Sequence, residues 1–266
     1  MERTYWQRQE AGKPLFPDLE WSRPENKQQA GKLLIIGGNL HGFAAPAEGF
    51  AEAAKAGIGT TRIVLPDALR KTVGRMLENG EYAPSTPSGS FSQKALGELL
   101  TCASWADGTL LAGDLGRNSE TAILLETFLA KYSGLVTLTK DAVDYITAAP
   151  DSVLHRDNTL LVLSLSQLQR LAVAAKSTTA VTLGMDLLHL VEWLHDFTSR
   201  HAPYIVVKHH NVILAAVNGR VVSTRLSTDI PVWRVAFAAH VSVWWLQNPG
   251  RAYEGIATGI VTRAAK

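Results

Sequence analysis

The stretch Lys32-Leu33-Leu34-Ile35-Ile36-Gly37-Gly38 decides the fold class. An uninterrupted apolar run such as Leu33 to Ile36 is typical of a parallel strand buried on both faces, whereas a strand with one solvent face alternates apolar and polar residues. The alanine-rich residues 44–56 follow, and Gly57 and Gly59 end them. The segment therefore predicts a strand, a glycine-rich turn and a helix.

The same alternation continues for some 200 residues. Apolar runs predict further strands at 60–65, 108–112, 135–139 and 160–165. Helical periodicity predicts helices at 96–103, 120–132, 167–175, 185–198, 235–246 and 253–263. Short polar turns, among them Asn218-Gly219, separate three late strands at 204–208, 212–216 and 220–223. This order predicts an α/β fold with a mostly parallel central sheet, helices on both faces and antiparallel edge strands.

The chain shows no linker or internal repeat that would divide it. Residues 1–31 are polar and contain Pro14, Pro17 and Pro24, which predicts an irregular N-terminal arm packed on the domain. Residues 32–266 then form a single domain. The loop Ser85 to Ser92, rich in proline, serine and glycine, is interpreted as a surface loop.

Composition excludes several classes of protein. The hydrophobic fraction of 46% is ample for a buried core, and the net charge of +2, with scattered basic residues, argues against nucleic-acid binding. Cys102 is the only cysteine, so an intrachain disulfide and a multi-thiolate zinc site are excluded, and an inert buried thiol is expected. No apolar run approaches the ~20 residues that span a bilayer, and no signal peptide precedes the first strand. We expect a cytoplasmic protein without a membrane partner, and a homo-oligomer stays open.

Two strand ends carry glycine-rich loops, at residues 37–42 and 113–118. Glycine lets backbone amides approach a phosphate closely, and a following helix N-terminus adds positive potential. Arg117 adds a guanidinium suited to a bidentate phosphate contact. Neither loop has the Walker or GxGxxG spacing, so a tight turn without a ligand is the alternative. A mostly parallel sheet binds ligands at the carboxyl ends of its strands, which favours a nucleotide site here.

These residues resemble a known family. Residues 22–24 and 31–38, with the helix that ends at 56–59, are similar to the opening of the NAD(P)H-hydrate dehydratases. The sequence Gly113-Asp114-Leu115-Gly116-Arg117 is similar to their second glycine loop, and 135–144 and 204–208 resemble later strands. That family belongs to the ribokinase-like superfamily, so the resemblance implies a ribokinase-like three-layer sandwich.

The resemblance also implies a function and cofactors. Such enzymes use ADP or ATP to phosphorylate the hydroxyl of NADH or NADPH hydrated on the nicotinamide ring, and elimination of phosphate restores the cofactor. Magnesium is expected to bridge the nucleotide phosphates, with no metal ligand among the protein side chains. His209 and His210 do not change this expectation, because adjacent strand residues point to opposite faces.

Site residues follow by resemblance. The expected substrate contacts are Gly37, Gly38, Asn39, His41, Gly42, Phe43, Gly113, Gly116, Arg117 and Asp141. Lys208 and Thr228 would lie near the nucleotide, and Asp229 would be the catalytic base. A helix cap or turn is the alternative role for Asp229.

The sequence departs from the family pattern where chemistry is expected. The family's Gly-Thr-Gly-Asp loop, whose amides hold the transferring phosphate, corresponds to Ser227 to Trp233, which has no glycine. Pro231 in this loop has no amide proton. The family's histidine and glutamate are also absent from the corresponding residues 162–167.

Three hypotheses therefore stand. The first is a nucleotide-dependent NAD(P)H-hydrate dehydratase, a lyase of metabolite repair, with a divergent active site. The second is a catalytically reduced protein of the same fold that binds nucleotide or dinucleotide. The third is a small-molecule kinase of the ribokinase-like superfamily. The resemblance favours the first.

Overall fold

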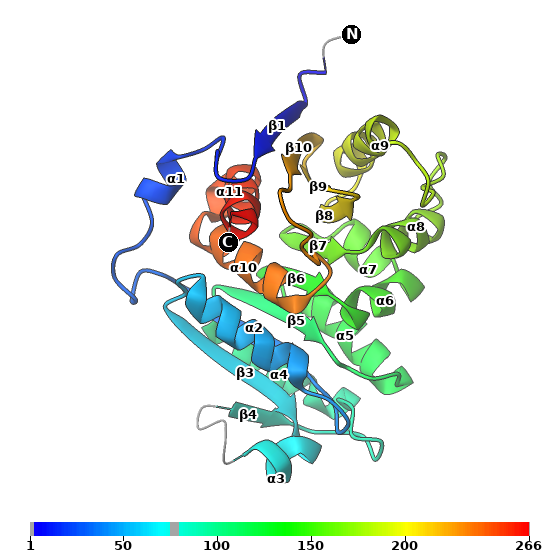
Figure 1. Ribbon diagram of the computed structural model, residues 1–266. Helices are drawn as coiled ribbons and strands as arrows, with labels where there is room; N and C mark the ends of the chain where they lie inside the picture. Colours follow the sequence, from blue (N-terminus) through cyan, green and yellow to red (C-terminus); the bar gives the residue numbers. More distant parts are fainter. Residues whose placement is uncertain (1–2, 75–79, 266) are drawn as a thin grey trace.

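The computed structural model describes residues 3–74 and 80–265. Its centre is one ten-stranded sheet in the order β1-β10-β9-β8-β7-β6-β5-β2-β3-β4 (Figure 1). The strands are β1 Trp6–Glu10, β2 Lys32–Gly37, β3 Thr60–Pro66, β4 Gly80–Ala83, β5 Gly108–Gly113, β6 Leu135–Thr139, β7 Thr159–Leu163, β8 Tyr204–His209, β9 Val212–Val217 and β10 Arg220–Arg225. All neighbouring pairs are parallel except those of β9 with β8 and β10.

Helices cover both faces of this sheet (Figure 1). The α-helices are α1 Asp18–Trp21, α2 Ala44–Lys55, α3 Arg70–Val73, α4 Leu96–Trp105, α5 Ser119–Lys131, α6 Asp141–Ala148, α7 Asp151–Leu154, α8 Leu165–Ala174, α9 Leu187–Arg200, α10 Val235–Gln247 and α11 Ala252–Ala264. Short 3₁₀ helices lie at Asp67–Leu69, Gln93–Ala95 and Pro249–Arg251. No described helix is long and apolar enough to cross a membrane.

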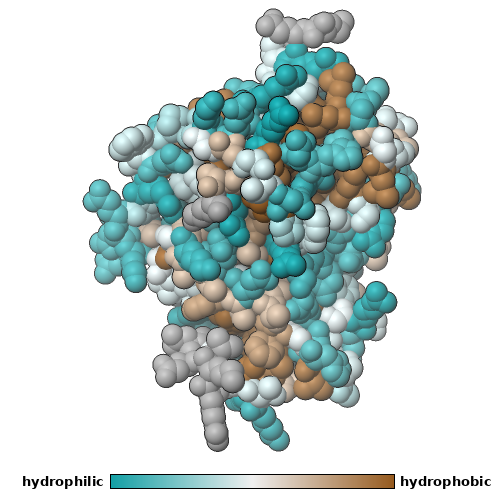
Figure 2. All heavy atoms as spheres, viewed as in Figure 1, coloured by the Kyte–Doolittle hydropathy of each residue, from teal (hydrophilic) through white to brown (hydrophobic). Residues whose placement is uncertain are grey.

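Two hydrophobic clusters hold the layers together, one on each face. In β2, Leu34 and Ile36 pack with the cluster that includes α4, α5 and α9, while Leu33 and Ile35 pack with the cluster under α2, α10 and α11. All four side chains are at most 1% exposed, so the strand is buried on both faces, as its continuous apolar run predicts. Hydrophilic residues predominate on the surface seen in Figure 2, with hydrophobic patches between them. The predicted mostly parallel α/β architecture is confirmed.

The N-terminal segment differs from the prediction of an irregular arm. Residues Trp6–Glu10 form β1, which pairs in parallel with β10, and α1 follows. A short, largely polar strand lacks a strong sequence signal, because its stability comes from hydrogen bonds to a partner more than 200 residues away.

The loop at residues 85–92 also differs from the interpretation as a surface loop. Phe91 is fully buried, and Thr86, Ser90 and Ser92 are 5–6% exposed. The Thr121 hydroxyl donates a hydrogen bond of 2.7 Å to the Phe91 carbonyl, which ties the loop to α5. Loop composition indicates a turn but says nothing about what packs over it.

The strand order reverses between β2 and β5. From β2 the chain continues outward to β3 and β4, whereas from β5 it continues in the opposite direction through β6 to β8. A crevice at such a switch point is where open α/β sheets bind ligands. The two glycine-rich loops follow these two strands and therefore flank the switch point.

Candidate functional site

The loops after β2 and β5 are joined directly. The Gly38 amide donates a hydrogen bond of 3.0 Å to the Gly113 carbonyl, and the Asn39 side-chain amide donates one of 2.5 Å to the Asp114 carbonyl. Asn39 also accepts a hydrogen bond from the backbone amide of His41. The first loop is thus a closed turn held against the second.

Glycine is required at two positions of the second loop. Gly113 has φ +94° and Gly116 has φ +78°, a region that other residues rarely adopt. A Cβ on Gly113 would lie 2.6 Å from the Asp141 carboxylate, and one on Gly116 would lie 2.7 Å from the Ser90 hydroxyl. The glycines therefore let Asp141 and the 85–92 loop approach the backbone.

The chain's own carboxylates occupy one amide at the start of α2 and one in the second glycine-rich loop. The Ala45 amide in the first turn of α2 donates a hydrogen bond of 2.7 Å to Asp114, whose other oxygen pairs with Lys140 at 2.5 Å. The Leu115 amide donates a hydrogen bond of 2.8 Å to Asp141. The amides that the sequence suggested for an anionic ligand are thus partly satisfied within the protein.

Asp141 lies at the start of α6 and is half-buried beside the second glycine-rich loop. One of its oxygens accepts from Leu115, and the other is buried without a hydrogen-bond partner. Burial raises the pKa of this carboxyl, and the nearby Asp114 charge raises it further, against the opposing effect of the Leu115 hydrogen bond. An unsatisfied acid beside the switch point is a candidate ligand contact.

Lys208 and Asp229 form the second part of the site. The Lys208 ammonium, at the end of β8 and with a side chain only 9% exposed, pairs with the Asp229 carboxylate and donates a hydrogen bond of 3.0 Å to the Ile230 carbonyl. Asp229 is 91% exposed, and Thr228 beside it is exposed as well. The helix-cap alternative for Asp229 is wrong, because α10 begins at Val235, after Arg234, without a side-chain cap.

A contact at β6 links the two parts. The Thr139 hydroxyl at the end of β6 donates a hydrogen bond of 3.4 Å to the Trp233 carbonyl in the loop that holds Asp229. The next residue, Lys140, pairs with Asp114 in the second glycine-rich loop. The Asp229 loop and the glycine-rich loops therefore lie on the same side of the sheet, at the carboxyl ends of its parallel strands.

The remaining predicted residues lie around this core. Arg117 is exposed and lines a cavity of about 340 Å³ with Gly116, Asp141 and Tyr145. The Tyr145 hydroxyl donates to the Gly116 carbonyl at 2.5 Å and accepts from the Asn118 amide. His41 is exposed, and Gly42 and Phe43 are half-buried at the entrance to α2.

Sequence reasoning missed Asp114, Lys140 and Tyr145. Asp114 stood inside the quoted glycine-rich loop, but its contacts with α2 and Lys140 depend on chain segments far apart in sequence. Ser164 and Gln167, in the stretch where the family pattern places a histidine and a glutamate, instead form a capping box at the start of α8. Within the described residues no group of three or more histidine, cysteine or acidic side chains is arranged to hold a metal ion.

Comparisons with known proteins bear on the family. No family model matches the chain. The bifunctional NAD(P)H-hydrate repair enzyme Nnr of Methanocaldococcus jannaschii is 32% identical over 126 residues, which are 46% of this chain and 24% of that relative. The chain thus matches only about a quarter of the length of this relative.

Solved structures show the fold. A ribokinase-like superfamily protein of Enterococcus faecalis superposes with a TM-score of 0.71 at 15% identity, covering 99% of this chain and 88% of the other. The ADP/ATP-dependent NAD(P)H-hydrate dehydratase of Bacillus subtilis, co-crystallised with ATP and Mg²⁺, superposes with a TM-score of 0.63 at 12% identity, covering 95% and 87%. The chain therefore has the ribokinase-like fold, and over 126 residues it is similar to a bifunctional NAD(P)H-hydrate repair enzyme.

Proposed function

We propose that this chain is a nucleotide-dependent NAD(P)H-hydrate dehydratase with a divergent active site. The observation that carries the proposal is the Lys208–Asp229 pair. This pair lies at the carboxyl ends of the parallel strands, as do the two glycine-rich loops after β2 and β5. The similarity to a named NAD(P)H-hydrate repair enzyme supports the substrate class. Hydrated NADH or NADPH would bind at the loops of residues 37–43 and 113–117 and beside Asp141.

Lys208 and Thr228 would hold the nucleotide. The Lys208 ammonium is nearly buried, and both its acceptors come from the loop after β10, so a phosphate can replace them without disturbing the sheet. ADP or ATP, when bound, supplies the phosphoryl group that turns the added hydroxyl into a leaving group. Magnesium would be held mainly by the nucleotide phosphates, because the described residues offer no cluster of metal ligands.

Asp229 would act as the base that accepts the proton of the substrate hydroxyl. In the structure its carboxylate is held by Lys208, and this contact has to break before Asp229 can reach a substrate. A phosphate bound at Lys208 would release Asp229 by replacing it as the partner of the ammonium. Nucleotide binding would thus precede proton transfer.

A catalytically reduced nucleotide-binding protein is the second candidate. It is favoured by the loop 227–233, which contains Pro231 and lacks the glycines that aim amides at a transferring phosphate. Loss of one such donor lowers the rate by about 10²–10³-fold. Asp114 and Asp141 also occupy amides that a ligand would otherwise use.

The test is recovery of NADH absorbance from hydrated NADH with magnesium and either ADP or ATP, alongside nucleotide binding by calorimetry. We expect recovery that requires nucleotide, and its loss in Asp229→Asn with nucleotide binding retained. Asp157→Asn is the matched control. Asp157 is exposed and lies just before β7, at the amino ends of the parallel strands and so on the side away from the candidate site.

Each other outcome selects an alternative. Nucleotide binding without recovery of NADH would favour the reduced binding protein. Phosphorylation of an added alcohol, such as a hydroxymethylpyrimidine, without NADH recovery would favour a small-molecule kinase. Unchanged turnover in Asp229→Asn would remove Asp229 from the mechanism.

A further inference from the structure

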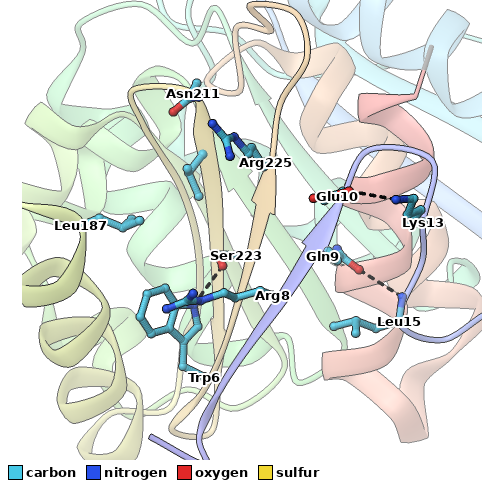
Figure 3. A pocket seen from close by; sticks show the side chains of 11 residues that line it. Trp6, Arg8, Gln9, Glu10, Lys13, Leu15, Leu187, Asn211, Ser223 and Arg225 are labelled. Atoms are coloured by element: carbon cyan, nitrogen blue, oxygen red, sulfur yellow. Dashed lines mark hydrogen bonds and ion pairs between the residues drawn. The ribbon is translucent and has the colours of Figure 1, made fainter.

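A cavity of about 740 Å³ lies away from the glycine-rich loops, at the end of the sheet formed by β1 and β10 (Figure 3). Strand β1 contributes Trp6 and Arg8, the end of β10 contributes Arg225, and the β8–β9 turn contributes Asn211. Leu187 at the start of α9 lines one side of it. A volume of this size suits a small organic ligand.

Strand register places the basic groups on one face. In the parallel pairing of β1 with β10, Arg8 lies opposite Ser223 and Glu10 lies opposite Arg225. Alternate residues of a strand share a face, so Trp6, Arg8 and Glu10 of β1 project to the same side as Ser223 and Arg225 of β10. Figure 3 shows the Arg8 and Arg225 side chains on adjacent strands of this pocket.

The two guanidinium groups have no acidic partner. Glu10 pairs with Lys13 at 3.2 Å, and among the residues that the structure describes no ion pair includes Arg8 or Arg225. Arg8 lies over the Trp6 indole, 4.1 Å from the ring centroid, which fixes its position. Glu10 also lines the pocket but pairs with Lys13, so the pocket presents the two guanidinium groups beside an aromatic wall.

The other polar groups of the pocket are already satisfied. The Trp6 indole nitrogen donates to the Ser223 hydroxyl at 2.9 Å, and that hydroxyl donates to the Gln7 carbonyl. The buried Gln9 amide donates to Thr224 and to the Ala257 carbonyl. A ligand would thus be recognised by the two guanidinium groups and the exposed Asn211 side chain.

We propose that this pocket binds a small organic phosphate, with its phosphate between Arg8 and Arg225. The organic part would lie along the apolar side chains of Trp6 and Leu187. A nucleotide and any other small phosphorylated metabolite present this same chemistry. The inference stands on the pocket and does not require the dehydratase activity.

The test is calorimetric titration of the full chain with AMP, inorganic pyrophosphate and adenosine. AMP should bind most tightly, pyrophosphate more weakly, and adenosine without measurable heat. Arg225→Gln and the double variant Arg8→Gln with Arg225→Gln should each raise the Kd for AMP at least tenfold. Because the Arg225 side chain makes no hydrogen bond or ion pair among the described residues, its single replacement should leave folding unchanged.

Arg200→Gln is the matched control for loss of one charge. Arg200 is exposed at the far end of α9, about 20 Å along the helix from Leu187. Its variant should bind AMP like the native chain. Absence of AMP and pyrophosphate binding, or unchanged affinity in both pocket variants, would overturn the proposal.

Fluorine NMR of the protein labelled with 5-fluorotryptophan separates the two sites. Trp6 reports on this pocket and Trp233, 47% exposed, reports on the Asp229 loop; substitution by phenylalanine assigns each resonance. AMP should shift the Trp6 resonance. A shift of Trp233 without Trp6 would assign AMP to the candidate active site and overturn the pocket, whatever the outcome for dehydratase activity.

Discussion

Replacing Asp114 should show how much the fold gains from a carboxylate placed in the switch-point loop. Asp114 accepts a 2.7 Å hydrogen bond from the Ala45 amide and pairs with Lys140 at 2.5 Å. Asp114→Asn keeps a carbonyl acceptor and tolerates the observed φ of 56°, so it removes chiefly the charge.

The magnitude follows from these contacts. Exchanging a charged acceptor for a neutral one lowers stability by about 1 kcal/mol, and losing the charge at the N-terminus of α2 adds about 0.3–1 kcal/mol. Lys140 is 35% exposed, so solvent screens its ion pair with Asp114. The stability lost with this ion pair therefore stays within the range given by the other two contributions. Asp114→Asn should therefore lower the free energy of unfolding by about 1–2 kcal/mol.

Asp114→Ala should be more destabilising, because it also removes the acceptor for the Ala45 amide. Loss of a cap costs about 0.5–2 kcal/mol, and alanine at positive φ costs about 1 kcal/mol more. The expected total is about 1.5–3 kcal/mol. Guanidinium unfolding followed by fluorescence and circular dichroism measures both variants, with Asp157→Asn as the exposed control. Equal stability of Asp114→Asn and this control, or of the two Asp114 variants, would refute the reasoning.

Three further predictions concern other described residues. Burial raises the pKa of Asp141 in the folded chain, so the stability associated with its protonated form is lost as pH rises through that pKa. Asp141→Asn should therefore be more stable than the native chain at neutral pH and should lose this advantage in acid. Unfolding midpoints of both proteins, measured from acid to neutral pH, test this. Burial and the hydrogen bond to Glu81 raise the pKa of the Cys102 thiol from 9.0 to about 12. Because the thiolate is the reactive form, a disulfide reagent should react ~10³-fold more slowly with the native than with the unfolded protein. Equal reaction rates would contradict this. Phe128→Ala removes a fully buried ring from α5 and should lower the unfolding free energy by about 3–5 kcal/mol, whereas Ile123→Ala on the same helix, where Ile123 is 48% exposed, should change it far less.

Local signals predicted most of the fold. The continuous apolar runs at β2 and β5 and the periodic helices α5 and α10 lie within a few residues of their expected bounds. These elements could be predicted because burial on both faces of a strand, or on one face of a helix, imposes a pattern on neighbouring residues. The weak elements β1 and β4 lack such a pattern, since each consists of a few residues held by a single neighbouring strand.

The sequence by itself also determined which residue types follow each strand, including the glycines, Lys208 and Asp229. Only the tertiary structure decided their partners: Asp114 binds the start of α2, Asp141 binds the second glycine-rich loop, and Lys208 holds Asp229. Hydrogen bonds and ion pairs form between groups that the fold brings within about 3 Å, whatever their separation along the chain. The pattern of a sequence specifies burial, whereas the pairing of its polar groups depends on how the buried elements are stacked.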